Sequence, residues 1–262
     1  MTETPDSYVS YAHDAGVARI TLVDGDRGNP IHPASVAQLF DAVRSAGRDG
    51  ARVIVLAAEG RFFSVGGDLA AFESAESPAD FIDDLAEALH RTIGELVRSE
   101  AIVVTVVQGT AAGAGFPLAA VGDVVIAADN VKFSLAYTKV GLSPDGGSSL
   151  LVNTLGLHRT LRLAILGDLL TAQEAYDAGL VARLVPAAEL ADTVEQVVGV
   201  LAASSASANG AAKRLLRDVA VPAPELALRK ETLSIRNQAG SPDGIEGVAA
   251  FVGKRAAQFN QG

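Results

Sequence analysis

Two glycine-rich loops contain the residues of this sequence whose types and spacing could do chemistry on a carbonyl group. The first, FSVGGDL, spans residues 63–69, and the second, QGTAAGAGF, spans residues 108–116. Each follows a predicted buried strand, and loops at the carboxyl ends of parallel strands are where open α/β sheets bind ligands. Glycine and alanine let a backbone N–H approach a ligand closely. Either loop alone is explained as a tight turn, but two such N–H groups aimed at one carbonyl oxygen would form an oxyanion hole.

Other candidate groups have weaker support. Glu87 and His90 have the spacing of half a di-iron motif, but no second copy accompanies them, so we expect a solvent-exposed helix face there. Ser148 or Ser149 with His158 could act as nucleophile and base. The sequence has no Gly-x-Ser-x-Gly elbow, however, and the hydroxyls suit a helix N-terminus. We therefore predict neither a metal site nor a serine hydrolase.

The composition excludes several classes of partner. The 262 residues include 31 acidic and 21 basic side chains, for a net charge of −10, so nucleic acid is not an expected partner. The absence of cysteine excludes disulfides and thiolate chemistry, and it fits a reducing, cytoplasmic setting. The polar N-terminal segment MTETPDSYVS does not resemble a leader. The apolar runs are far shorter than the roughly 20 residues of a membrane span, so no membrane association is expected.

Strand-like and helix-like segments alternate in the first half of the chain. Apolar residues at helical spacing predict helices over residues 36–43 and 82–97. Alternation of this kind is typical of crossover units on a mostly parallel sheet, so we expect an α/β fold with both sheet faces covered. Short β-branched runs predict the strands, over residues 17–23, 52–56, 102–107 and 123–128.

The second half of the chain is predicted to be mostly helical, and only residues 180–185 look extended. The segment VPAP at residues 221–224 has the composition of a linker. We therefore expect a core over residues 1–200 and a C-terminal helical region over residues 201–262.

Five segments, taken in order, resemble the enoyl-CoA hydratase/isomerase (crotonase) superfamily. They are FSVGGDL, QGTAAGAGFPLAAVGDVVIAAD, FSLAYTKVGLSPDGG, TAQEAYDAGLVARLV and AFVGKRAAQF, and they extend over nearly the whole chain. Each segment is weak by itself, but five in the right order are specific. The resemblance implies a crotonase-like spiral of ββα repeats with a C-terminal α-helical trimerisation region. This fold agrees with the alternation of strands and helices.

The resemblance also implies that an acyl-CoA thioester carbonyl lies between two backbone amides, which stabilise the resulting enolate. By position, these amides are those of Gly67 and Ala114. Many relatives carry glycine at the second position, but alanine keeps the N–H. Asp68 is expected to accept a hydrogen bond that fixes the loop, or to cap a helix, rather than to carry a proton. Neighbouring residues of the first loop are expected to bind the substrate: Ser64, Gly66, Asp68 and Leu69.

The acid or base at the site decides the reaction. Hydratases of the family use two glutamates to handle water, and this chain has Pro117 and Tyr137 at the matching positions. Asp145 remains, at a position where isomerase branches carry an acid that moves a proton along the acyl chain. The resemblance therefore implies an enoyl-CoA isomerase of fatty acid metabolism. Hydratase (lyase) activity and a catalytically silent acyl-CoA binder are the alternatives.

Two of these residues also have simpler explanations. Asp145 lies in a Pro-Asp-Gly sequence, which is favoured in turns for local reasons. Tyr137 could pack in the core, line the acyl pocket or form a hydrogen bond with Asp145.

Binding of CoA by an acidic protein requires local cations. The resemblance assigns Arg27, after the first predicted strand, to the CoA phosphates. It also places Phe251 and Lys254 against the CoA of a neighbouring subunit in a trimer or a hexamer. The same charges are otherwise ordinary surface residues. CoA is part of the substrate, and no further cofactor is expected.

Overall fold

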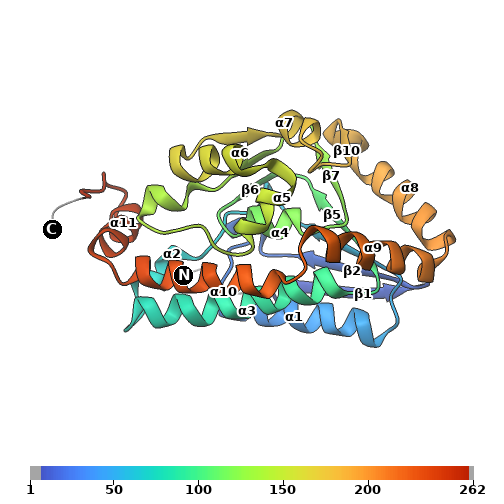
Figure 1. Ribbon diagram of the computed structural model, residues 1–262, viewed down its shortest axis with the longest axis horizontal. Helices are drawn as coiled ribbons and strands as arrows, with labels where there is room; N and C mark the ends of the chain where they lie inside the picture. Colours follow the sequence, from blue (N-terminus) through green and yellow to red (C-terminus); the bar gives the residue numbers. More distant parts are fainter. Residues whose placement is uncertain (1–6, 260–262) are drawn as a thin grey trace.

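A six-stranded sheet forms the first layer of the protein (Figure 1). The computed structural model describes residues 7–259. The strands, in their order across the sheet, are β1 (Val9–Asp14), β2 (Val17–Leu22), β3 (Val53–Ala58), β5 (Ile102–Val107), β7 (Val124–Ala128) and β10 (Arg183–Val185). β1 and β2 form an antiparallel hairpin, and the other neighbouring pairs are parallel. The predicted mostly parallel sheet is confirmed, although the last strand is shorter than the extended segment expected at residues 180–185.

Four short strands form a second sheet, and they alternate along the chain with strands of the first sheet. Its strands are β4 (Phe62–Ser64), β6 (Thr110–Ala112), β8 (Lys132–Ser134) and β9 (Leu169–Thr171). β4, β6 and β8 are parallel, and each comes directly after a strand of the larger sheet in the chain. Helical segments follow each of these pairs, so the repeating unit is ββα. The ββα spiral that the resemblance implied is therefore the observed fold.

Helices cover the two sheets. The longer ones are α1 (Pro33–Arg48), α3 (Pro78–Arg98), α8 (Leu190–Ala203), α9 (Ala206–Ala220), α10 (Pro224–Ala239) and α11 (Pro242–Val252). The shorter ones are α2 (Leu69–Glu73), α4 (Gly115–Ala120), α5 (Val152–Leu155), α6 (Leu157–Leu161) and α7 (Ala172–Asp177). α1 and α3 each have proline in the first turn and bury an apolar stripe, as their sequence spacing predicted.

The core lies between the larger sheet and its helices. Val53, Ile54, Val55 and Leu56 of β3 are each at most 3% exposed. Because neighbouring side chains of a strand point to opposite faces, both faces of the sheet are covered at this strand. α10 runs beside α3, and α3 runs beside α1, along the lower side of the view in Figure 1. α11 packs against α2 at the opposite end of the molecule from α8 and α9.

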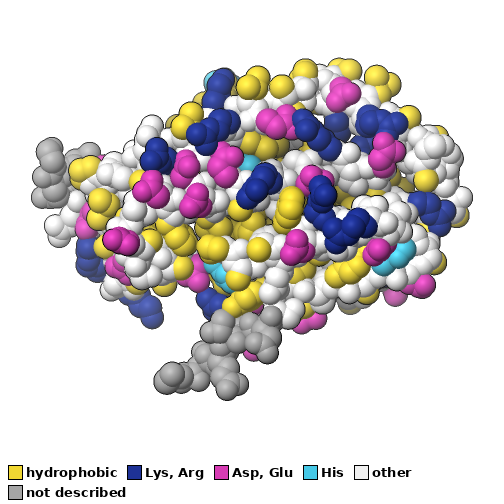
Figure 2. Space-filling model, turned by 90° about the horizontal axis from the view of Figure 1, so that it is seen from below, with side chains coloured by type: hydrophobic (Ala, Val, Ile, Leu, Met, Phe, Trp, Pro, Cys, Tyr) yellow, Lys and Arg dark blue, Asp and Glu magenta, His cyan; other side chains and the backbone are white. Residues whose placement is uncertain are grey.

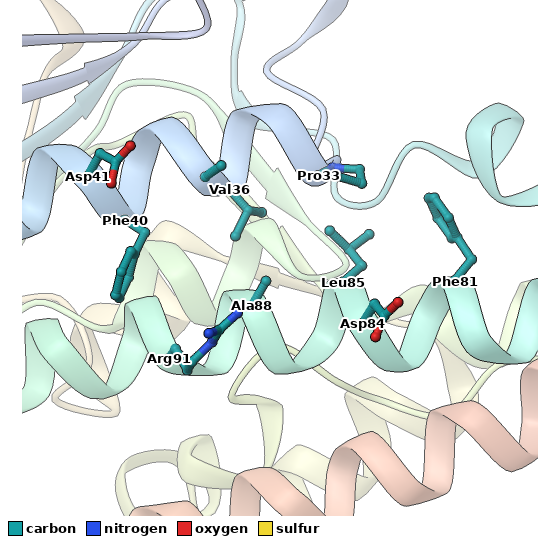
Figure 3. A pocket seen from close by; sticks show the side chains of 10 residues that line it. Pro33, Val36, Phe40, Asp41, Phe81, Asp84, Leu85, Ala88 and Arg91 are labelled. Carbon is teal, nitrogen blue, oxygen red and sulfur yellow. The ribbon is translucent and has the colours of Figure 1, made fainter.

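The lower face carries charges of both signs. Figure 2 shows Lys and Arg side chains spread over this face among Asp, Glu and hydrophobic side chains, without a continuous basic surface. A groove of about 370 Å³ lies between α1 and α3 and is lined by Phe40, Phe81 and Arg91 among others (Figure 3). We call it the α1–α3 groove. None of the residues predicted for the site lies in it.

Candidate active site

A cavity of about 270 Å³ lies where the two glycine-rich loops meet α3 and α11. We call it the site cavity. Its lining is mostly apolar, and Asp145 is the one carboxylate among the described residues that form it. Both predicted oxyanion residues, Gly67 and Ala114, line it as well. The aliphatic part of the wall includes Ile31, Leu69, Ile82, Leu85, Leu89, Leu142 and Ile235.

The backbone N–H groups of Gly67 and Ala114 are available to a ligand. Ile31 bonds to the peptide groups on either side of Gly67: its N–H donates to the Gly66 carbonyl at 2.8 Å, and its own carbonyl accepts from Asp68 N–H at 3.0 Å. Ala114 is the N-cap of α4, where an amide has no helical partner. Within residues 7–259, neither N–H donates a hydrogen bond to the chain. Two unused donors thus share one cavity.

Ser64 holds the first glycine-rich loop in place through two hydrogen bonds. It is fully buried, its hydroxyl donates to the Asn29 carbonyl at 2.8 Å, and the same oxygen accepts from Gly66 N–H at 3.1 Å. A β-carbon at Gly115 would lie 2.6 Å from the Ser64 β-carbon, so the start of α4 packs directly on this serine. Ser64 therefore acts on the loop, and it does not line the site cavity.

Asp145 is held in place through its backbone. Its carbonyl accepts hydrogen bonds from the hydroxyls of Tyr137, at 2.9 Å, and Ser148, at 2.6 Å. Tyr137 belongs to a short 3-10 helix, η2 (Ala136–Val140), and lines the cavity. Burial, together with the carboxylates of Asp145 and Glu231, holds the pKa of Tyr137 well above its usual range. The phenol therefore stays protonated and remains a donor.

A histidine contacts the Asp145 carboxylate. The Nε2 atom of His90, on α3, lies 3.0 Å from Oδ1 of Asp145 and 3.5 Å from Oε2 of Glu231, on α10. The Nδ1 atom of the ring lies 3.1 Å from the Thr232 hydroxyl. The contact between Nε2 and Oδ1 is an ion pair, because it is short but lacks the alignment of a hydrogen bond.

The two carboxylates decide the charge of the ring. Burial alone would lower the pKa of His90, but Asp145 and Glu231 outweigh it and raise the pKa from 6.5 to about 9. The imidazole is therefore positively charged at neutral pH.

The expectation that His90 lies on a solvent-exposed helix face is wrong. Its side chain is only 5% exposed. A signal was present in the sequence, because His90 lies four residues after the buried Ala86 and three before the buried Ile93. Glu231 was also missed, although its neighbours Leu228 and Ile235 are buried at helical spacing. In both helices a polar residue occupies the apolar stripe.

Glu231 ties the histidine to the segment after Asp145. Its Oε2 accepts from Gly147 N–H at 2.8 Å, and its Oε1 accepts from Ser149 N–H at 2.8 Å and from the Ser149 hydroxyl. His90, Asp145 and Glu231 place their potential metal-ligand atoms within 4.8 Å of one another. Amide donors already occupy both Glu231 oxygens, however, and the histidine supplies the positive charge. The three side chains therefore have the chemistry of an ion-pair network.

A model of the family described as enoyl-CoA hydratase/isomerase matches residues 12–262. The chain belongs to the enoyl-CoA hydratase/isomerase family. As a member of this crotonase family it is an acyl-CoA enzyme.

Relatives within the family carry different reaction names. The chain is 35% identical to the 1,2-epoxyphenylacetyl-CoA isomerase of Escherichia coli K12 over 252 residues, covering 94% of this chain and 95% of that protein. It is 32% identical to the 2,3-dehydroadipyl-CoA hydratase of the same organism, covering 93% and 94%. A crystal structure of an enoyl-CoA hydratase from Mycobacterium avium subsp. paratuberculosis K-10 superposes with a TM-score of 0.88. Its sequence is 30% identical, and the match covers 98% of this chain and 100% of that one. Family membership thus defines the substrate class more sharply than the reaction.

Arg27, predicted for this family member, contacts the first glycine-rich loop through Asp68. Arg27 forms ion pairs with Asp24 at 3.2 Å and Asp68 at 2.9 Å, and its side chain is 45% exposed. Asp68 caps α2 by accepting from Ala71 N–H, which agrees with the expected capping role. Leu69, next to it, lines the cavity.

The C-terminal residues are placed differently from one another. Phe251, on α11, lines the cavity of its own chain, whereas the resemblance implied a contact with CoA in a neighbouring subunit. Lys254 follows α11 and is exposed.

Pro117, in place of one hydratase glutamate, is buried in α4. Across residues 7–259, every helix is too short or too polar to cross a bilayer.

Proposed function

We propose that the protein is an enoyl-CoA isomerase that moves a double bond along the acyl chain of a CoA thioester or rearranges a related ring-derived thioester. One observation carries the proposal: the site cavity contains two unused backbone amides and a single carboxylate, Asp145, among the described residues that line it. Shifting a double bond from the 3,4 to the 2,3 position needs one group that both takes and returns a proton.

The proposed reaction has two proton transfers. The Asp145 carboxylate takes a proton from C2 of a 3-enoyl thioester, and the electrons of that C–H bond move toward the thioester oxygen. The N–H groups of Gly67 and Ala114 stabilise the enolate oxygen. The neutral carboxylic acid of Asp145 then returns the proton to C4 as the double bond forms between C2 and C3. The carboxylate is regenerated, and no other reactant is consumed.

Hydration is the alternative within the same family. Adding water to a 2-enoyl thioester requires groups that position water and supply its proton, and relatives use two glutamates. Pro117 has no ionisable group, and the Tyr137 hydroxyl donates to the Asp145 carbonyl. This arrangement favours isomerisation over hydration. A catalytically silent acyl-CoA binder would share the two amides but would not need an ionised Asp145.

We further propose that Arg27 and Lys254 meet the phosphates of CoA and that the chain assembles as a trimer or a hexamer in the cytoplasm. Support for assembly comes from large apolar side chains left exposed on and after α6, each at least 40% exposed. They are Leu157, Leu161, Ile165, Leu166 and Leu169.

Incubation with a panel of 3-enoyl-CoA and 2-enoyl-CoA thioesters tests the proposed function. Absorbance of the conjugated thioester reports isomerisation, and mass spectrometry reports the gain of a water molecule. We expect 3-enoyl thioesters to be converted without a change of mass, and 2-enoyl thioesters to be hydrated weakly. Tight binding of the whole panel without any conversion would instead identify a silent binder.

A further inference from the structure

Three charged side chains are buried together beside the site cavity: His90, Asp145 and Glu231. The proposed reaction uses Asp145 and gives no role to the other two. Asp145 reaches the cavity, whereas His90 and Glu231 do not line it. The side chains of all three are 5 to 6% exposed. Burying ionised groups is costly unless each is paired and hydrogen-bonded, so the arrangement needs a physical reason.

Contacts on both sides fix the orientation of the His90 ring. Thr232 lies against Nδ1, and on the Nε2 side the carboxylate of Glu231 is itself held by two backbone amides of the segment 147–149. The ring therefore cannot rotate without losing contacts on both edges. Its Nε2 atom lies 3.0 Å from one oxygen of Asp145, Oδ1.

The other oxygen of Asp145 remains for the substrate. Oδ1 is enclosed by the protein, and its close contact is His90. Oδ2 accepts no hydrogen bond from any of residues 7–259. Because Asp145 lines the cavity, Oδ2 is the oxygen that can meet an acyl chain there.

We propose that His90 is a positioning residue: its imidazolium, anchored by Glu231, holds Oδ1 of Asp145 so that Oδ2 is presented to the acyl chain in the site cavity. This role rests on the proposed function of Asp145 as the proton carrier. It assigns no proton transfer to His90, because the ring does not reach the cavity.

A second hollow lies beside His90. This hollow has a volume of about 380 Å³ and lies between α3 and α10, open to the surface and separate from the site cavity. The raised pKa of about 9 agrees with a ring that stays charged at neutral pH. Besides Asp145, Glu231 and the neutral Tyr137, the charged groups around the ring are Glu87, Arg91, Glu95, Arg98, Glu225 and Arg229.

The first test is kinetic and uses His90→Gln, which keeps a neutral N–H donor of similar reach but removes the charge. His13→Gln, the same exchange at an exposed histidine of β1, is the matched control. We expect His90→Gln to lower kcat by about 10²-fold, the scale of misplacing a reacting group by about 1 Å, with KM unchanged. The kcat of the wild type should fall as the pH rises through about 9, because His90 loses its charge there. The kcat of His90→Gln should not show this fall.

The second test does not depend on activity. The chain has four histidines, and ¹⁵N labelling with His90→Gln for assignment follows the His90 ring alone. We expect an imidazolium at pH 8 in the wild type, and a lower titration midpoint in Asp145→Asn and in Glu231→Gln. Glu231→Gln removes the negative charge and keeps an acceptor for one of the two backbone amides that Glu231 holds. Circular dichroism checks that each variant is folded.

Two results would overturn the positioning role. One is a neutral His90 at pH 8 that does not respond to Asp145→Asn. The other is a folded His90→Gln protein with the kcat and pH profile of the wild type. Failure of the proposed function gives a different pattern: the wild type would isomerise no thioester, while the NMR titration would still report whether His90 is charged by Asp145.

Discussion

Gly66 and Ala112 touch so closely that a β-carbon on Gly66 would lie 2.8 Å from the Ala112 carbonyl oxygen. Gly66 also has a φ of +91°, a backbone conformation that residues other than glycine rarely adopt. This contact locks the first glycine-rich loop against the second. It explains how Gly67 and Ala114, which are far apart in the sequence, present their N–H groups to one cavity.

Removing either N–H should slow the reaction. Proline at Ala114 fits the observed φ of −62° but has no amide hydrogen, so we expect Ala114→Pro to lower kcat by about 10²-fold or more. Ala114→Gly is the control that keeps the donor. At Gly67 a β-carbon meets nothing within 4 Å, so Gly67→Ala should be tolerated and Gly67→Pro should not. A folded proline variant with full activity would show that its amide does not hold the thioester oxygen.

Stability should depend on pH through His90. The native pKa of about 9 lies above the ordinary 6.5, so the folded protein binds more protons than the unfolded chain between these pH values. The stabilisation is complete below pH 6.5 and is lost as the pH rises through 9, with a magnitude of about 3 kcal/mol. Urea unfolding at several pH values measures it. His90→Gln should flatten this part of the curve, and an equally steep curve would assign the effect to another group.

Metal chelation should leave the enzyme unchanged. Glu231 already accepts two backbone amides, and His90 supplies the positive charge between the carboxylates. We therefore expect the same kcat before and after treatment with EDTA. Loss of activity that zinc or manganese restores would mean that His90, Asp145 and Glu231 hold a metal ion.

Lys254 should contribute to CoA binding and not to the chemistry. We expect Lys254→Ala to weaken binding of CoA by about tenfold, the scale of one charge-assisted hydrogen bond, with part of the difference lost at high salt. Lys132→Ala, at an exposed lysine of β8, is the matched control. Light scattering should report a trimer or a hexamer. A monomer whose affinity for CoA survives Lys254→Ala would contradict both parts of this prediction.

Much of the fold follows from local sequence, because long apolar segments such as β5 and α3 carry enough residues to show a pattern. The strands β4, β6, β8 and β9 were missed, since three residues are too few to show alternation. Asp145 and the two amides were predicted through the resemblance, which fixes positions that local sequence leaves open. His90 and Glu231 were not predicted. Their pairing joins α3 to α10 across 141 positions of the chain, which no local pattern encodes.

Asp145→Asn tests the central claim most directly, because the exchange keeps the shape of the side chain and removes the base. Rates of 3-enoyl-CoA isomerisation and 2-enoyl-CoA hydration are measured side by side in both proteins, with CoA-ligand affinity as the control for folding and binding. The proposed mechanism predicts that the wild type isomerises efficiently and that Asp145→Asn abolishes isomerisation while affinity is kept. Efficient hydration that Asp145→Asn leaves unchanged would contradict it.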